Sequence, residues 1–453
     1  MKLLSRYKNK NNNITYQLYE LDNGVKLIHL NNPATVNFDF AVIHKAGAVY
    51  ENLEKVPQGT AHMLEHMLFR PNLLFKTDQE IYQFEQGNKD RPAIYLNGGT
   101  SKKYLYLNGH SNEAGAMRIL ERISSMIGFP KEKLAESFEI ERGIVVAERS
   151  RDIKTEKDKF IQYLKYLEGD VFPEFIYPTS GEIKDIKSIS LDDLEKYFKN
   201  RFTKENVTIA VQSKGKLDKR IQSTIQEIAN KYPDKTSKIF EKRTLTNKLT
   251  IGSFFDERSN GTSIFLSYFE ENPKGCDLKK DAINNLFSRL IRKFGEEVLR
   301  DKLGLIYSMN IDSIGYLAFD YSLRELNFVI ENPKIEEALD ALEKFLFKDL
   351  QEFLESSRGE EWFEHILSLL IYPRTVEYDS DLAESITYTY IQDECIYNAN
   401  EYREVAKKIR KEDLIKRIKE FQETKPYFWI ESNLRKHNVE KIVRQSSLWK
   451  RFK

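Results

Sequence analysis

Residues 62–66, His62-Met63-Leu64-Glu65-His66, decide how the fold and the chemistry of this 453-residue chain are interpreted. His62 and His66 are one helical turn apart and Glu65 is three residues after His62, so the three side chains can project from one face of a helix. Two neutral imidazoles in this arrangement suit a Zn²⁺ ion, and a neighbouring carboxylate can take a proton from the water that the ion activates. The stretch therefore predicts a hydrolytic zinc site with His62 and His66 as ligands and Glu65 as general base.

The residues around this stretch are almost all apolar, which predicts a buried helix. They are Ala61, Met63, Leu64, Met67, Leu68 and Phe69. An unpaired carboxylate in such surroundings costs several kcal/mol, so Glu65 and the two histidines must compensate one another or hold a cation. The alternative is a structural cluster of two core histidines and a salt-bridged glutamate. A chance H-x-x-E-H pattern is expected in about one in a hundred chains of this composition.

The segments that flank the helix extend this pattern on both sides. Upstream lie a predicted buried strand at residues 38–45, Ala46-Gly47-Ala48-Val49-Tyr50-Glu51 and Gly59-Thr60-Ala61, and downstream lies Tyr95-Leu96-Asn97-Gly98-Gly99-Thr100-Ser101. Together with H-x-x-E-H, the order found in inverzincins, these segments resemble the pitrilysin/insulinase family of zinc metallopeptidases, and the resemblance covers essentially the whole chain. It implies an α+β fold of two similar domains, each a mostly antiparallel sheet packed with helices, in a single-length subunit like those of processing peptidases.

A zinc site of this type needs a third protein ligand and keeps a fourth position for water. Glu141 and Glu148 lie seven residues apart in a long predicted helix, so they share one face. The family resemblance implies that Glu148 is the third ligand and that Glu141 supports catalysis by orienting or polarising the site. Glu139 is the fallback ligand. Without the resemblance, an acidic surface stripe interleaved with Arg142 and Arg149 would be the ordinary interpretation.

A second motif lies in the other half of the chain. Residues 294–308 are predicted to form a helix, a glycine-containing helix end and the start of a strand. They resemble the family's R-x-x-L-G-x-x-Y motif, with Arg300 and Tyr307 at its fixed positions. An arginine can bind a substrate carbonyl or carboxylate, and a tyrosine hydroxyl can donate to the oxyanion of a tetrahedral intermediate. The structural alternative is a helix-end arginine and a tyrosine that packs on a strand.

An edge strand near residues 97–100 is the expected substrate-binding element. The resemblance implies that an extended peptide pairs there through its main chain, beside Asn97, Gly98 and Gly99. Gly98 stands where alanine is usual in the family. Because this pairing recognises the backbone rather than side chains, broad specificity is expected.

Composition agrees with a protein of two domains, predicted at residues 1–235 and 248–453 with a linker between them. The 71 Lys and Arg residues nearly balance the 70 Asp and Glu residues, so nothing favours a nucleic-acid or anionic-membrane partner. Cys276 and Cys395 form no metal or redox motif and are expected to be reduced thiols in a cytoplasmic protein. The N-terminal residues lack the apolar core of a signal peptide, and no apolar run is long enough for a transmembrane helix.

Hydrophobic periodicity and turn residues predict the secondary structure. Predicted strands are residues 14–21, 25–30, 38–45, 94–107, 207–212, 249–255, 263–269, 306–314, 319–329 and 427–432. Predicted helices are residues 77–85, 112–127, 131–152, 157–169, 191–200, 217–231 and 278–299, followed by a series between 334 and 418. The similar order of elements in the two halves suggests a duplicated unit.

These observations predict a zinc-dependent endopeptidase that binds one Zn²⁺ per chain and hydrolyses peptides or small unfolded proteins in an enclosed chamber. By resemblance, two chains would close around that chamber, as a homodimer or as a heterodimer with a related chain. Two alternatives remain: a dedicated peptidase that matures one precursor peptide, and a non-catalytic scaffold subunit of the same fold.

Overall fold

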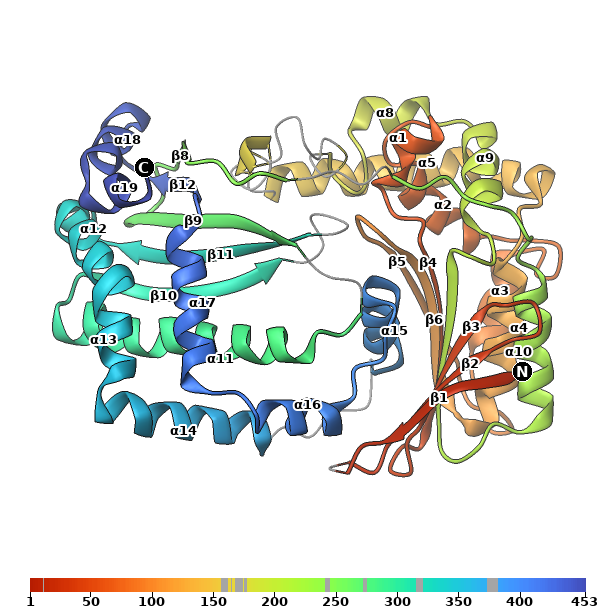
Figure 1. Cartoon of the computed structure of the whole chain (residues 1–453). Helices are drawn as coiled ribbons and strands as arrows, with labels where there is room; N and C mark the ends of the chain where they lie inside the picture. The colour runs from red at the N-terminus through yellow and green to blue at the C-terminus, as the bar shows by residue number, and fades with distance from the viewer. Residues whose placement is uncertain are drawn as a thin grey trace. The chain divides into compact units, whose positions relative to one another are not determined.

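The chain divides into two compact units in the computed structural model (Figure 1). The structure describes residues 1–10, 12–155, 162–163, 165–167, 174, 177–240, 245–271, 275–314, 321–372 and 382–453. Unit 1 contains Met1–Glu156, Glu174–Glu241 and Val376–Asn398, and unit 2 contains Lys157–Pro173, Lys242–Thr375 and Ala399–Lys453. The predicted domains, 1–235 and 248–453, differ from these units because each unit includes one segment from the other half of the sequence. Most of the predicted helix at 157–169 lies outside the described residues.

A seven-stranded mixed sheet forms the centre of the described part of unit 1, in the order β1-β2-β3-β7-β4-β6-β5. Its strands are β1 (Lys2–Lys8), β2 (Thr15–Glu20), β3 (Lys26–Asn31), β4 (Asn37–His44), β5 (Tyr95–Thr100), β6 (Leu105–Asn112) and β7 (Val207–Ser213). Only the β3–β7 pair is parallel among these described strands. The predicted hairpin forms between β2 and β3. Strand β1 was not predicted, because its mostly exposed Lys-rich residues show no hydrophobic alternation.

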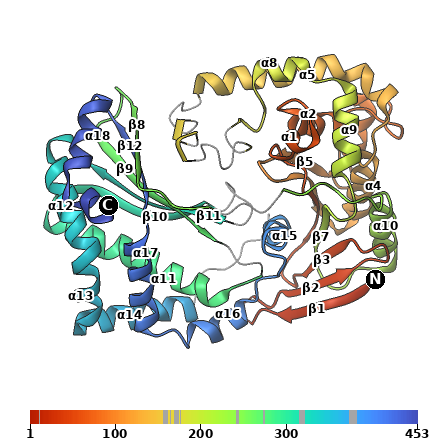
Figure 2. The same cartoon turned by 45° about the horizontal axis from the view of Figure 1, so that its top comes forward.

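Helices cover both faces of this sheet. They are α1 (Tyr50–Glu54), α2 (Thr60–Leu68), α3 (Asp78–Glu85), α4 (Ala116–Met126), α5 (Lys131–Thr155), α8 (Ile183–Ser188), α9 (Leu191–Arg201), α10 (Lys219–Asn230) and α15 (Leu382–Asp393), with a 3₁₀ turn at Glu113–Gly115. Helices α4 and α10 lie on one face, and α15 packs on β3, β4 and β7 (Figure 2). Ala41, Ala210 and Ala383 meet there, and these small side chains allow α15 to lie close to the strands.

Unit 2 repeats this topology. Its strands are β8 (Thr250–Phe255), β9 (Thr262–Glu271), β10 (Ile306–Ile314), β11 (Tyr321–Ile330) and β12 (Tyr427–Ser432), in the order β10-β11-β9-β12-β8. The order β5-β6-β4-β7-β3 of unit 1 is the same, and in both sheets only the last pair is parallel among the described strands. The predicted α+β class, with two sheets packed by helices, is confirmed.

A large apolar core lies between the second sheet and its helices. The helices are α11 (Leu278–Gly295), α12 (Ile335–Lys344), α13 (Leu350–Glu355), α14 (Ser357–Ile371), α16 (Ala399–Ala406), α17 (Lys411–Glu423), α18 (Lys436–Gln445) and α19 (Ser447–Phe452), with a 3₁₀ turn at Asn332–Lys334. Two π-helical segments were not predicted, η2 (Glu296–Lys302) and η4 (Phe345–Asp349). The first directly continues α11 and contains Arg300, and π-helical turns occur frequently at functional sites.

The cysteines differ from expectation. Cys276 and Cys395 are both disulfide-bonded, and neither is a free thiol. The prediction of two reduced thiols is therefore wrong. Among the described residues, no helix combines the length and the apolar character needed to cross a bilayer.

Candidate metal centre

Helix α2 carries the H-x-x-E-H stretch and is fixed at its start by Gly59. This residue has a φ of +90°, and a Cβ added there would lie 2.4 Å from the carbonyl oxygen of Ser180. Only glycine meets both conditions without strain. Met63 and Leu64 are fully buried. The predicted burial of this helix is thus confirmed, and its polar face is left for the histidines.

Glu51 binds the open N-terminus of α2. Its two carboxylate oxygens accept hydrogen bonds from the backbone N–H groups of Gly59, at 3.0 Å, and Ala61, at 2.7 Å. Glu51 is fully buried, and burial raises the pKa of its carboxyl to about 8, although both backbone donors act in the opposite direction. The sequence showed Glu51 only as part of a flanking motif, because a cap from outside the helix has no local signal.

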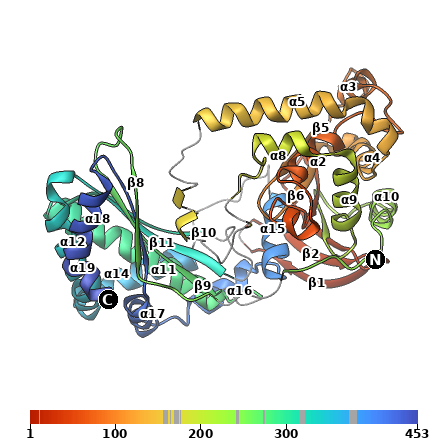
Figure 3. The same ribbon diagram turned by 90° about the horizontal axis from the view of Figure 1, so that it is seen from above.

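Helix α5 packs against α2 (Figure 3). His62 and His66 of α2 meet Glu148 of α5 there. One ligand atom from each of the three residues lies within 4.8 Å of the other two. Glu148 Oε2 is 3.9 Å from His62 Nε2 and 3.5 Å from His66 Nε2. Among the described residues, this is the one group of His, Cys, Asp or Glu side chains with such spacing. The fallback residue Glu139 is not part of it and pairs instead with Arg142.

The donor set fits a zinc ion. Two imidazoles and one carboxylate form the His₂Glu set that is known in catalytic zinc sites, where a fourth position stays open. Burial, followed by the influence of His66, lowers the pKa of His62 to about 4. The His62 imidazole is therefore neutral near pH 7, which is the state that binds metals. The side chains of His62 and Glu148 are 13% and 33% exposed, so solvent reaches the group.

Glu65 stands beside this group. One of its carboxylate oxygens lies 3.9 Å from His62 Nε2. Burial raises the pKa of the Glu65 carboxyl, and the Glu148 carboxylate adds to the rise while His66 opposes it. A raised pKa brings a carboxylate closer to the range in which it can both accept and return a proton.

Glu141 and Arg70 support His66 from behind. Glu141 is almost fully buried, and one of its oxygens lies 3.1 Å from His66 Nδ1. Its other oxygen forms an ion pair with Arg70, which also pairs with Asp78 at 3.2 Å. A carboxylate on the second ring nitrogen fixes the tautomer and the orientation of a ligand histidine. Arg70 was missed in the sequence; it lies two residues beyond the end of α2, where helical spacing no longer applies.

The edge strand β5 packs beside α2, and it pairs with β6 alone among the described strands. A Cβ added at Gly98 would lie 2.6 Å from the Phe69 ring and 3.2 Å from Glu65 Oε1, so this glycine faces the candidate site. Asn97 and Gly99 alternate to the other face, where Gly99 lies against Tyr106. Within the described part of the chain, the main-chain edge of β5 next to Glu65 is therefore not paired with another strand.

Arg300 and Tyr307 belong to unit 2. Arg300 donates through Nε to Asp301 at 2.8 Å and approaches Glu296 at 3.8 Å. Tyr307 is the second residue of β10 and is 78% exposed. The helical segment that contains Arg300 ends before Gly304, which has a φ of +61°, as the sequence predicted. Both side chains are exposed to solvent.

Comparison with known sequences shows which proteins this chain resembles. Residues 188–362 match the family model described as Peptidase M16 inactive domain. A protein described as Probable mitochondrial-processing peptidase subunit beta, mitochondrial, from Arabidopsis thaliana, is 25% identical over 195 residues, which span 42% of this chain and 34% of that relative. The chain is related to the M16 peptidases. The matched range 188–362 begins after Glu148, so the M16 description as inactive does not refer to the residues of the metal group.

Solved structures show the same M16-type fold. The first half of the periplasmic protease PqqL from Escherichia coli has a TM-score of 0.76 at 15% identity, with 99% of this chain and 98% of that chain covered. Pitrilysin has a TM-score of 0.74 at 15% identity, with 96% of this chain and 47% of that chain covered. Full-length PqqL is covered to 51%. This M16-related chain thus has the fold of one half of these proteases and spans about half their length.

Proposed function

We propose that this chain is a zinc-dependent endopeptidase that acts on peptides or small unfolded proteins. The observation that carries the proposal is the convergence of His62, His66 and Glu148 within 4.8 Å, with Glu65 beside them. Three protein ligands and an adjacent carboxylate are what metal-assisted hydrolysis requires.

The proposed mechanism assigns a task to each residue. His62, His66 and Glu148 would hold one Zn²⁺ ion, which when bound supplies a Lewis acid that makes water nucleophilic near pH 7. Glu65 takes a proton from the attacking water and passes it to the leaving amine. Glu141 holds His66 in the orientation that binding needs.

The substrate would bind as an additional strand on β5. Main-chain hydrogen bonds to Asn97, Gly98 and Gly99 would hold it, with the scissile carbonyl next to Glu65. The absence of a side chain at Gly98 leaves room for a peptide backbone to approach. Such pairing recognises extended backbone, which favours unfolded substrates of varied sequence.

A second chain would complete the active site. The chain covers 51% of full-length PqqL and 47% of pitrilysin. We propose a homodimer, or a heterodimer with a related chain, in which the second chain supplies the other half. In this arrangement Arg300 binds a substrate carbonyl or carboxylate and Tyr307 donates to the oxyanion, both across the cavity from the partner's metal group.

Mixing two inactive variants tests this arrangement. A Glu65→Gln chain and a Tyr307→Phe chain should each be nearly inactive, and a mixed dimer should regain activity because one of its sites keeps both residues. A Glu65→Gln chain mixed with a Glu65→Gln/Tyr307→Phe chain is the matched control and should stay inactive. Mixed dimers that form and remain as inactive as their parents would show that Tyr307 does not act in trans.

A scaffold function is the first alternative; the matched M16 model is described as inactive, and its range, residues 188–362, does not include the metal group. A dedicated processing function is the second, and it is favoured by the processing-peptidase relative. Metal analysis combined with cleavage of generic unfolded peptides distinguishes the proposed endopeptidase from these two alternatives. Zinc with generic cleavage supports the proposal, zinc without generic cleavage favours the dedicated processor, and a chain without zinc favours the scaffold.

The disulfide-bonded cysteines change the proposed location. The cytoplasmic expectation depended on reduced thiols, and disulfides persist in oxidising compartments. We therefore propose an oxidising compartment, in keeping with the periplasmic protease PqqL. Protein isolated from its native cells under alkylating conditions should react with thiol reagents only after reduction, and reaction before reduction would restore the cytoplasmic prediction.

A further inference from the structure

Because the two units share one topology, the region of the candidate metal centre in unit 1 has a counterpart in unit 2. Because the strand orders match, β10 is the counterpart of β5, and α11, which connects β9 to β10, is the counterpart of the helices that connect β4 to β5. In unit 1 the candidate metal centre lies where α2 meets α5, with β5 packed beside α2. In unit 2 the counterpart region holds a cavity of about 230 Å³ between α11 and β10, which pack against each other.

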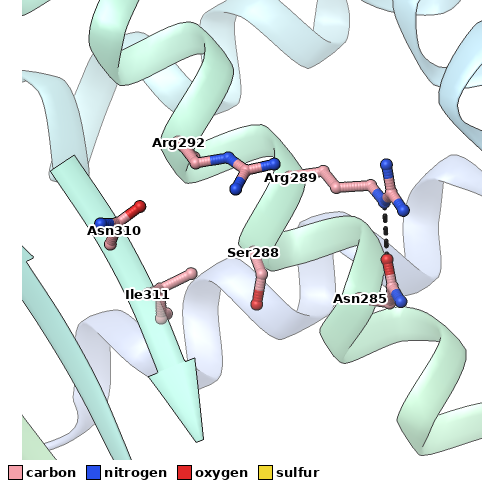
Figure 4. A pocket seen from close by; sticks show the side chains of 6 residues that line it. All are labelled: Asn285, Ser288, Arg289, Arg292, Asn310 and Ile311. Atoms are coloured by element: carbon pink, nitrogen blue, oxygen red, sulfur yellow. Dashed lines mark hydrogen bonds between the residues drawn. The ribbon is translucent and has the colours of Figure 1, made fainter. Parts of the chain in front are cut away.

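The lining of this cavity is polar and positively charged (Figure 4). It consists of Asn285, Ser288, Arg289 and Arg292 from α11 and Asn310 and Ile311 from β10. Arg289 and Arg292 are three residues apart and therefore lie on the same face of the helix. No carboxylate is among these lining residues.

Most hydrogen-bond donors of the two guanidinium groups are unused. Arg289 donates through Nε to Asn285 Oδ1 at 2.7 Å, which leaves its four terminal N–H groups. The side chain of Arg292 forms no ion pair or hydrogen bond with another residue in the described part of the chain. Both guanidinium groups thus line one cavity, and in the described part of the chain neither pairs with a carboxylate.

Another cavity of unit 2 differs in the charge of its lining. It measures about 440 Å³ and is lined by acidic as well as basic side chains. Lys279 pairs with Asp413 at 2.8 Å, and Arg417 approaches Glu270 at 3.7 Å. Its charges are therefore balanced within the protein, whereas those of Arg289 and Arg292 are not.

We propose that the cavity between α11 and β10 binds a small phosphate-type oxyanion. Guanidinium groups bind phosphate oxygens through paired hydrogen bonds, and two of them match an anion with two or more charges. The side chains of Ser288 and Asn310 add neutral donors at the sides. The volume corresponds to roughly eight water molecules at about 30 Å³ each, enough for pyrophosphate as well as phosphate. The duplicated position thus holds a cation site in one unit and an anion site in the other.

Calorimetric titration of the full-length chain with inorganic phosphate, pyrophosphate, ATP and acetate tests this proposal. We expect binding of phosphate and pyrophosphate that weakens with added salt, and tighter binding of pyrophosphate. Arg292→Gln should weaken pyrophosphate binding by at least about tenfold, and Arg289→Gln/Arg292→Gln should abolish it. Lys293→Gln is the matched control, because Lys293 is exposed on the same helix but does not line the cavity. Tighter binding of ATP than of pyrophosphate would assign the phosphate groups to a nucleotide.

Three results would overturn the proposal. The first is an absence of measurable binding at millimolar pyrophosphate. The second is unchanged binding in the double variant, which would place the anion elsewhere, for instance at the metal centre. The third is equal affinity for acetate, which would indicate a carboxylate ligand. Equal unfolding temperatures of the variants and the parent chain, measured without anion, verify that folding is intact.

Discussion

Replacing Arg70 with glutamine tests how the metal centre is supported. The change removes the cation that pairs with one oxygen of Glu141, while the other oxygen remains beside His66 Nδ1 at 3.1 Å. Removing one partner of a fully buried ion pair costs about 3–5 kcal/mol. The Arg70 side chain is 28% exposed, so water screens the pair, and we expect a loss of about 1–3 kcal/mol in the free energy of unfolding.

The same change should weaken zinc binding, because Glu141 would no longer be held against His66. Loss of such outer-shell support typically lowers metal affinity about 10–100-fold. Competition with a chromogenic chelator measures the zinc affinity, and denaturant unfolding measures the stability. Asp78→Asn is the matched control, since it removes the exposed partner of Arg70 and leaves the Glu141 pair intact. Zinc affinity in Arg70→Gln equal to that of the parent chain would refute the assigned role.

Further predictions address single contacts. Glu148→Gln should lower zinc affinity sharply and Glu141→Gln should mainly slow turnover; the reverse outcome in metal binding and kinetics would exchange their roles. Burial lowers the pKa of His29 from 6.5 to about 4, so the unfolded state binds more protons below pH 6.5 and stability falls as the pH decreases from there. His29 should therefore destabilise the fold by about 2 kcal/mol at pH 5 relative to pH 8, and denaturant unfolding of His29→Leu should show a pH-dependent loss smaller by that amount. Gly98→Ala should lower the free energy of unfolding by about 1 kcal/mol because the new methyl group meets the Phe69 ring. Adding Phe69→Leu to the same chain should recover this loss in unfolding experiments.

Local pattern was enough to predict most elements near the candidate site. Strand β4 and helix α2 are rich in apolar residues, and Met63 and Leu64 of α2 are fully buried. The seven-residue spacing of Glu141 and Glu148 correctly placed both on one side of α5, where they contact the histidines of α2.

Other features depend on contacts that sequence spacing does not contain. The sequence of helix α15 does not reveal that this helix packs on β3, β4 and β7 of unit 1. The π-helical turn around Arg300 has the same apolar spacing as an ordinary helix end. The partners of Glu51 and Arg70 lie across a loop and on another helix, so their roles appear only when the elements are assembled.

The metal content and peptidase activity of three chains, measured side by side, test the central claim most directly. The parent chain should contain one Zn²⁺ per chain and cleave an unfolded peptide. Glu65→Gln should keep the zinc and lose at least about a hundredfold in cleavage rate, because an amide cannot accept the proton. Glu148→Gln should lose both zinc and activity. A parent chain without zinc, or a Glu65→Gln chain that loses its metal or cleaves as fast as the parent, would contradict the account.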